Sequence, residues 1–404
     1  MPDISEYVVL FHGNLGMGER LQSAQQRRGI ENTPWDRLQH VVFVPGLFHL
    51  KMAAADAIWR IFLQPNAARL DETSLMQDVG ISRPRETGHY GSKPGFHCMH
   101  ELIMHDSICC RLDCWRVEAG KGDTKWTSLE EFAGSESTWK DIKAMAHTLA
   151  RNYIAGHQLW RMRRAPAAQR DVQYENGLLL NKYVLIYEEL SYAMNIGDIG
   201  RVETCLVTLI PMFKATGKHK YANAMTDFLC KVHFMYPEGL KLTIGRRAVH
   251  YHIMVNPTGK KGKFRAVDWC VELNNLFTKV TNGGKGSNHT VSRIIMESPL
   301  IQIYRNLHTM FQNDFLHVQQ TTKHAEADMS KMFQVLCRHM RKHSSNEVVK
   351  GRGSHYSIPE VLAKGQELME KNSVDNEDGG QEAAIREGED EHPSVDDVAI
   401  ELVW

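Results

Sequence analysis

Residues 7–20 read YVVLFHGNLGMGER, and this stretch sets the expectation for the N-terminal part of the fold. A short β-branched and apolar run ends at His12, and glycines follow at Gly13, Gly16 and Gly18. An apolar run that is closed by glycine predicts a buried strand over residues 6–12, with a short polar-faced helix after it. The loop between strand and helix is therefore the first candidate for a functional site.

This glycine loop lacks the pattern of a phosphate-binding loop. A dinucleotide-binding fingerprint needs the spacing G-x-G-x-x-G, whereas the chain has the reversed spacing G-x-x-G-x-G. A Walker A loop ends in Gly-Lys-Ser/Thr, but here Gly18 precedes Glu19, whose carboxylate would repel a phosphate. We therefore interpret the loop as a turn between a strand and a helix.

The composition is that of a soluble globular protein, with 42% apolar and 24% charged residues in a chain of 404. The 48 basic and 48 acidic residues balance overall, but they are unevenly distributed. Residues 371–404 contain eleven acidic and two basic residues, so the remaining body carries a net positive charge of about nine. A basic body with an acidic tail is compatible with nucleic-acid contact, and a solvated, disordered terminus is the simpler interpretation of the tail.

The expected cellular environment follows from the cysteines and the N-terminus. Eight cysteines in a chain of this length do not form the dense framework of a small secreted domain. The N-terminal residues MPDISEYVVLFHG have no basic flank and no long apolar core, and no run approaches the roughly 18 apolar residues of a membrane span. We therefore expect an intracellular protein that does not cross a membrane, and we expect no cofactor.

Hydrophobic periodicity predicts an α/β fold that is predominantly helical. The stretch LQHVVFVPG gives a second strand over residues 40–44. We predict a partial α/β core over residues 1–63, a loop-rich connection over 64–96, an all-helical insertion over 97–255, a basic loop and C-terminal helices that complete the core over 256–343, and a polar to acidic, mostly disordered tail over 344–404.

Cysteine and histidine are concentrated in HCMHELIMHDSICCRLDCW, residues 97–115. On a helix His105 and Cys109 are i, i+4 neighbours, as are Cys110 and Cys114, so either pair could chelate zinc. However, no C-x-x-C spacing occurs, and the two pairs lie on different sides of the helix. Since buried cysteine commonly packs as a small apolar residue, we favour a packed helix and keep a zinc site as the alternative.

Two acidic residues follow a basic loop in the C-terminal half. Asp268 and Glu272 in DWCVELNNLF project from one face of a predicted helix, because they are four residues apart. The preceding loop carries Lys260, Lys261, Lys263 and Arg265, which we assign to nucleic-acid binding. Carboxylates hold Mg²⁺ and a basic loop attracts phosphate, as a metal-dependent nuclease needs. The alternative is an acid that favours the helix dipole, together with a solvent-exposed Glu272.

Several blocks resemble one known family when they are taken together. They are HGNLGMGERL, TPWDRLQHVVFVPGLFHLKMAAADAIWR, KPGFHCMHELIMH, FKATGKHKYA and DWCVELNNLFTKVTNGGKGSNHT, in this order along the chain. The blocks are similar to those of a large fungal family of unknown function. Its members look like relatives of mobile-element transposases, with a G-D-x-x-T-type motif, a following F-H motif and a late helix that contains glutamate.

The resemblance implies a ribonuclease-H-like core, in which acids from a strand end and from a late helix hold two metal ions about 4 Å apart. Where the family pattern has an aspartate after Gly13, this chain has Asn14, and the later threonine of the motif is Met17. His49 stands at the F-H motif and would either orient the site or lie in the core. The candidates for a relic site are thus Asn14, His49, Asp268 and Glu272, with Mg²⁺ expected only if this site still binds metal.

An amide cannot supply the negative charge that a divalent metal needs. The chain also begins a few residues before the first strand, so the resemblance implies that an upstream acid is absent. The leading hypothesis is a truncated, catalytically inactive, transposase-derived protein with residual DNA binding. The alternatives are a helical scaffold for protein–protein interaction and a zinc-stabilised DNA-binding protein.

Overall fold

The computed structural model describes residues 7–121, 126, 128–154, 158–238, 253–275, 290–311, 314 and 328–377. It contains two compact units, and neither is continuous in sequence. The first, which we call the strand unit, comprises Met1–His49, Ala248–Asp328 and Asp390–Trp404. The second, the helical unit, comprises Leu50–Arg247 and Met329–Glu389. These units divide the chain after residues 49, 247, 328 and 389, whereas the sequence-based segments end at 63, 96, 255 and 343.

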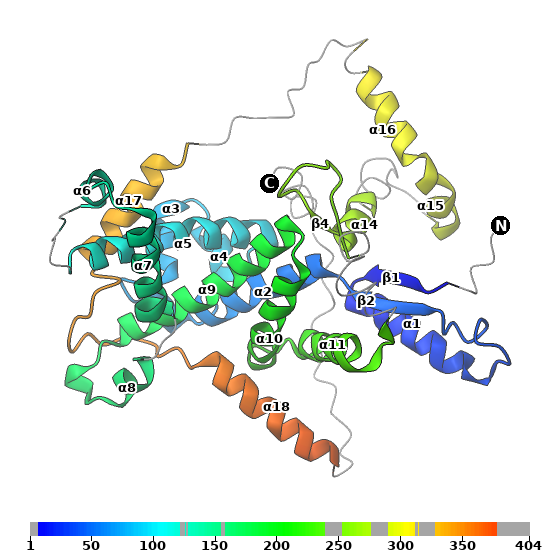
Figure 1. Ribbon diagram of the computed structural model, residues 1–404, viewed down its shortest axis with the longest axis horizontal. Helices are drawn as coiled ribbons and strands as arrows, with labels where there is room; N and C mark the ends of the chain where they lie inside the picture. The colour runs from blue at the N-terminus through cyan, green and yellow to red at the C-terminus, as the bar shows by residue number, and fades with distance from the viewer. Residues whose placement is uncertain are drawn as a thin grey trace. The chain divides into compact units, whose positions relative to one another are not determined.

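Both strands predicted near the N-terminus are present, as β1 (Val9–Gly13) and β2 (Val41–Pro45) (Figure 1). They pair in parallel, with Val9 opposite Val41 and Gly13 opposite Pro45. The helix α1 (Leu15–Arg27) connects them and packs on β2. The carboxyl ends of β1 and β2 therefore lie at the same edge of this sheet.

The rest of the strand unit comes from the second half of the chain. The predicted basic loop is the turn of a short antiparallel hairpin, in which Met254 pairs with Ala266 and Val255 with Arg265. The hairpin leads directly into a helix that contacts β1 and β4. The described elements here are β3 (Met254–Val255), β4 (Arg265–Ala266), α14 (Val267–Asn275), α15 (Val291–Glu297), η8 (Ser298–Leu300) and α16 (Ile301–Met310).

The described part of the helical unit is built from helices, which confirms the predominantly helical prediction. Its elements are most of α2 (Leu47–Phe62), η3 (Asn66–Arg69), α3 (Leu75–Ser82), α4 (Thr87–Ser92), α5 (Phe96–Ala119), α6 (Leu129–Gly134), α7 (Trp139–Leu149), η4 (Ala150–Ile154), α8 (Leu159–Arg164), η5 (Ala167–Gln169), α9 (Val172–Ile196), α10 (Ile199–Ala215), α11 (His219–Cys230), η6 (Lys231–Met235), α17 (Ser330–Lys342) and α18 (Val361–Glu377). No helix in the described ranges is long and apolar enough to span a bilayer.

The core of the helical unit lies around α9 and α10. The helices α9, α11 and α18 all pack on α10, and α17 packs on α5. Fully buried side chains such as Tyr183, Tyr187 and Phe213 fill the space between these helices. Burying an aromatic side chain of this size contributes about 2–3 kcal/mol.

Two segments that were expected to be largely irregular contain helices. The connection over 64–96 contains η3, α3 and α4, with Leu75, Val79 and Tyr90 buried. Within the tail predicted to be mostly disordered over 344–404, residues 344–377 belong to the described chain and include α18. Residues 378–404 lie outside the described residues.

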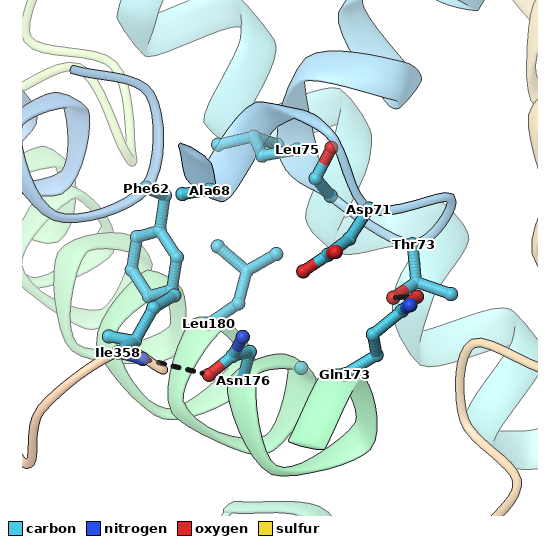
Figure 2. A pocket seen from close by; sticks show the side chains of 11 residues that line it. Phe62, Ala68, Asp71, Thr73, Leu75, Gln173, Asn176, Leu180 and Ile358 are labelled. Atoms are coloured by element: carbon cyan, nitrogen blue, oxygen red, sulfur yellow. Dashed lines mark hydrogen bonds between the residues drawn. The ribbon is translucent and has the colours of Figure 1, made fainter. Parts of the chain in front are cut away.

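The segment before α18 is fixed to the helical unit by buried acids and an amide. Asp171 accepts hydrogen bonds from the guanidinium of Arg352 at 2.7 and 2.8 Å, and Asn176 accepts one from the backbone of Ile358 at 3.0 Å. Figure 2 shows Asn176 facing Asp71 across a small cavity. The cavity has a volume of about 20 Å³, which is room for about one water molecule, and both polar and apolar side chains line it, so it is too small for a larger ligand.

Close packing of α18 on α10 depends on one glycine. A Cβ at Gly365 would lie 1.9 Å from the carbonyl oxygen of Pro211. Gly365→Ala should therefore lower the free energy of unfolding by about 1–3 kcal/mol, although alanine is intrinsically the better helix former. Urea unfolding of the full chain measures this change.

The matched control is Gly80→Ala, because Gly80 lies in α3 and a Cβ added there would have no heavy atom within 4 Å. We expect this variant to be unchanged or slightly more stable. Equal behaviour of the two variants would contradict the close approach of α18 and α10.

Candidate functional site

The strand ends predicted to carry the site do meet, and Asn14 lies at this edge. Asn14 follows β1 directly and serves as the N-cap of α1, where its side-chain oxygen accepts a hydrogen bond from the Met17 backbone at 3.0 Å. The backbone N–H of Gly46 donates to the Gly13 carbonyl at 2.9 Å and extends the pairing of the strands. The Asn14 oxygen that could coordinate a metal is thus engaged by the helix that follows it.

Asp268 reaches the same edge from α14. Its carboxylate accepts hydrogen bonds from the backbone N–H groups of Phe48 and His49, each at 3.1 Å. These N–H groups belong to the first turn of α2, where helix geometry leaves them without intrahelical acceptors. Asp268 therefore acts as a remote N-cap for α2, and its negative charge is favourable at this end of the helix dipole.

His49 lies between the two acids that the sequence singled out. Its Nδ1 atom is 2.9 Å from Asp268, and its Nε2 atom is 3.7 Å from a carboxylate oxygen of Glu272. The side chains of His49 and Asp268 are 4% and 2% exposed, whereas Glu272 is 12% exposed. The predicted candidates His49, Asp268 and Glu272 thus form one buried cluster, with Glu272 nearest to solvent.

Gly46 explains how Asp268 approaches α2 so closely. A Cβ at this position would lie 2.2 Å from an Asp268 carboxylate oxygen, so a side chain of any size would displace the acid. Sequence analysis missed this contact, although a signal was present. The stretch VPGLFHLK begins a helix without Ser, Thr, Asp or Asn at its N-terminus, which indicates that the cap comes from elsewhere.

The cluster fits a hydrogen-bond network better than a metal site. Both Asp268 oxygens accept protein hydrogen bonds, and the Asn14 oxygen caps α1. Across the described ranges, no three or more His, Cys, Asp and Glu side chains are grouped so that they could hold a metal ion. In this arrangement the acids orient His49 and the start of α2, and no step through Mg²⁺ follows from it.

The basic residues before α14 fall into two groups. Lys260 and Lys261 are exposed in the hairpin turn and Lys263 is half-buried, whereas Arg265 is only 5% exposed. The Arg265 guanidinium donates to the Phe264 carbonyl at 2.8 Å, so the predicted surface role of Arg265 does not agree with its position. The turn itself is held by a hydrogen bond from the Asn256 amide to the Lys260 carbonyl at 2.8 Å.

The predicted zinc candidates lie in the packed interface of α5. Cys109 and Cys110 form a core cluster with Leu336 and Met340 of α17, and the His105 ring packs edge-on against Phe333. The hydrogen bond of the Cys109 thiol to Cys337, together with burial, raises the pKa of Cys109. Because zinc binds the thiolate, these neutral, packed thiols agree with the packed-helix interpretation.

A buried carboxyl pair in the helical unit escaped sequence analysis. Asp78 of α3 and Asp106 of α5 are 4% and 2% exposed, and their carboxyl groups hydrogen bond to each other. Burial raises the pKa of Asp106 to about 7, with Glu188 adding to the increase. Burial and the proximity of Asp106 raise the pKa of Asp78 well above its usual value. The two acids are 28 positions apart in the chain, so no local motif marks them.

Comparison with known proteins places the chain among proteins without an assigned activity. The model of a family described as "Family of unknown function (DUF6589)" matches residues 1–324. No curated protein matches the chain. No solved structure matches it either.

If Asp268 is a structural cap, removing its charge should destabilise the strand unit. We expect Asp268→Asn to lower the free energy of unfolding by about 2–4 kcal/mol, because it removes the charged acceptor of two buried backbone N–H groups and weakens the contact with the His49 ring. Urea unfolding measures the loss. The control in the same unit is Glu297→Gln, which removes the partly exposed pair with Arg293 and should cost at most about 0.5 kcal/mol. Equal stability of the two variants would refute the capping role.

The Asp78–Asp106 pair should make stability depend on pH. A carboxyl whose folded-state pKa is raised stabilises the protein below its unfolded pKa, and this contribution is lost as pH rises through the folded pKa, here about 7. The asparagine of Asp106→Asn stays neutral at every pH. Between about pH 5 and about pH 8 the free energy of unfolding of this variant should therefore rise by about 2–3 kcal/mol relative to that of wild type. Unfolding free energies across this range provide the measurement.

The control for this experiment is Asp227→Asn, which alters a 58% exposed carboxylate that pairs with Lys231. Its pH profile should follow that of wild type within a few tenths of a kcal/mol. A wild-type profile for Asp106→Asn would contradict the raised pKa of the buried pair.

Proposed function

The chain belongs to the DUF6589 family, which carries no assigned activity, and we propose that it is a transposase-derived protein that binds nucleic acid and has lost phosphoryl-transfer chemistry. The observation that carries the proposal is the strand edge. Asn14 occupies the position of an expected acid and caps α1, while Asp268 caps α2. The side-chain oxygens of these two residues, which a metal-dependent site would need as ligands, thus accept hydrogen bonds from backbone N–H groups.

The order of elements supports the transposase-derived origin. A parallel pair of strands comes first, a long helical region follows, and an acidic helix then returns to contact β1. This order is the one that the resemblance implies for a ribonuclease-H-like core with a helical insertion. Because the described sheet of β1 and β2 has two strands, the relationship rests on the order of elements and on the clustering of His49, Asp268 and Glu272.

Retained nucleic-acid binding is supported by the hairpin before α14. Residues 239–267 contain seven lysines and arginines and no acidic residue. Gly259 and Gly262 adopt positive φ angles of 67° and 73°, which shape the turn that carries Lys260, Lys261 and Lys263. A turn that is fixed by its own hydrogen bonds presents these charges with little loss of entropy on binding phosphate.

A second candidate function, a protein-interaction scaffold, is favoured by one feature of the strand unit. The helices α15 and α16 expose apolar side chains, including Ile295 (66%), Met296 (70%) and Leu307 (51%). Several exposed apolar side chains on successive helices are a feature of proteins that contact other proteins. Salt dependence separates the two functions, because phosphate neutralisation releases counterions and gives a steep salt slope.

The test is duplex DNA binding by the variant with Lys260, Lys261 and Lys263 all changed to alanine. If these lysines contact phosphates, the slope of log K against log salt concentration should fall by about 2–3, since each neutralised phosphate contributes about 0.9. Fluorescence anisotropy at several salt concentrations measures the slope.

A matched control changes Lys331, Lys342 and Lys350, three exposed lysines of the helical unit, to alanine. This variant should retain the wild-type slope. An unchanged slope for the hairpin variant would remove the hairpin from the interface, and salt-independent or absent binding by wild type would favour the scaffold. Mg²⁺-dependent cleavage of the duplex by wild type would contradict the loss of chemistry.

A further inference from the structure

A second basic region lies in the helical unit, far along the chain from the hairpin. Residues 142–170 contain six lysines and arginines and no acidic residue. This run covers most of α7, then η4, α8 and η5, and residues 155–157 within it lie outside the described residues.

Two of these arginines have partners within the protein. Arg163 and Arg170 both approach Glu175, whose side chain is fully buried, at 3.8 and 2.7 Å. Arg163 also donates to the Ile358 carbonyl, and Leu159 is buried. These contacts fasten α8 to the body of the helical unit, so the rest of its surface is held in a defined orientation.

The outer face of α8 carries a different set of residues. Trp160 is 59% exposed, and the Arg164 guanidinium stacks on its ring at 4.0 Å from the centroid. Arg161 lies beside them and, like Arg164, is at the surface. Among the described residues no carboxylate forms an ion pair with Arg161 or Arg164. We call Trp160, Arg161 and Arg164 the α8 surface.

A large exposed aromatic ring with unpaired cations has a specific chemical use. An indole face offers a stacking platform for a planar base, and the neighbouring guanidinium groups can contact the phosphates on either side of that base. Bases inside a duplex are stacked on each other and cannot reach such a ring, whereas unpaired bases can. The stacked Arg164 also limits the motion of the Trp160 ring, which lowers the entropy lost on binding.

We propose that the α8 surface binds single-stranded nucleic acid by stacking a base on Trp160 and pairing backbone phosphates with Arg161 and Arg164. This inference rests on the proposed function and extends it to unpaired strands. The residues that it uses belong to the helical unit, whereas the hairpin belongs to the strand unit. The two can therefore succeed or fail separately.

The experiment measures binding of a labelled single-stranded oligonucleotide of mixed sequence to the full chain by fluorescence anisotropy. Trp160→Ala should weaken binding about 5-fold to about 100-fold, which is the range seen when a stacking aromatic is removed. Trp160→Phe should restore part of the loss, because a phenyl ring still stacks. The matched control is Trp139→Ala, which removes a 76% exposed tryptophan at the start of α7 and should bind as wild type.

The charges are tested with the double variant Arg161→Ala/Arg164→Ala, which should lower the salt slope by about 1.4 for a single strand. The control is Arg338→Ala/Arg341→Ala, two arginines of α17 with the same three-residue spacing. The hairpin variant should lose duplex binding but retain single-strand binding. Circular dichroism establishes that each variant is folded.

Three outcomes would overturn the proposal. Wild-type affinity of Trp160→Ala would exclude stacking, and equal losses for both double-arginine variants would show diffuse attraction without a defined site. Binding of anionic phospholipid vesicles that depends on Trp160, without oligonucleotide binding, would assign the surface to membranes instead.

Discussion

The strand unit depends on the contact between the Asp268 carboxylate and the first turn of α2. This one side chain accepts two backbone N–H groups and the His49 ring across a separation of about 220 residues in sequence. Gly46 makes the approach possible, and the absence of a local capping residue makes it necessary. A segment from the second half of the chain thereby completes the edge formed by β1 and β2.

The same contact determines what the edge can do chemically. A carboxylate that already receives three protein hydrogen bonds could coordinate a cation only if some of them were broken, with the cost of exposing buried N–H groups. Asn14 is constrained similarly by α1, and its amide brings no charge. The side-chain oxygens of Asn14 and Asp268 are used here to hold helix ends, and the nucleic-acid binding that we propose involves surfaces outside the cluster.

The elements that sequence alone predicted are those with a strong local pattern. β1 and β2 are short apolar runs closed by glycine or proline, and α5 and α9 repeat apolar residues at helical spacing. The meeting of His49, Asp268 and Glu272 could be expected only through the family resemblance. α18 was missed because its composition is polar, and what anchors it is a glycine that touches a distant carbonyl. Arg265 was misplaced because its charge suggests exposure, whereas a sheet position buries it.

The position of α17, α18 and the segment between them has a consequence for biosynthesis. These residues come last in the described chain, yet Arg352 holds Asp171 at the start of α9, and α18 covers α10. When the ribosome adds residue 330, the residues of α9 and α10 have already been synthesised. At that point α18, which packs on α10, and Arg352, which pairs with the buried Asp171, have not. The segment Leu50–Arg247 therefore cannot complete the fold of the helical unit during translation until the later segment has been made. Its nascent form exposes apolar surface until residues 330–377 have emerged.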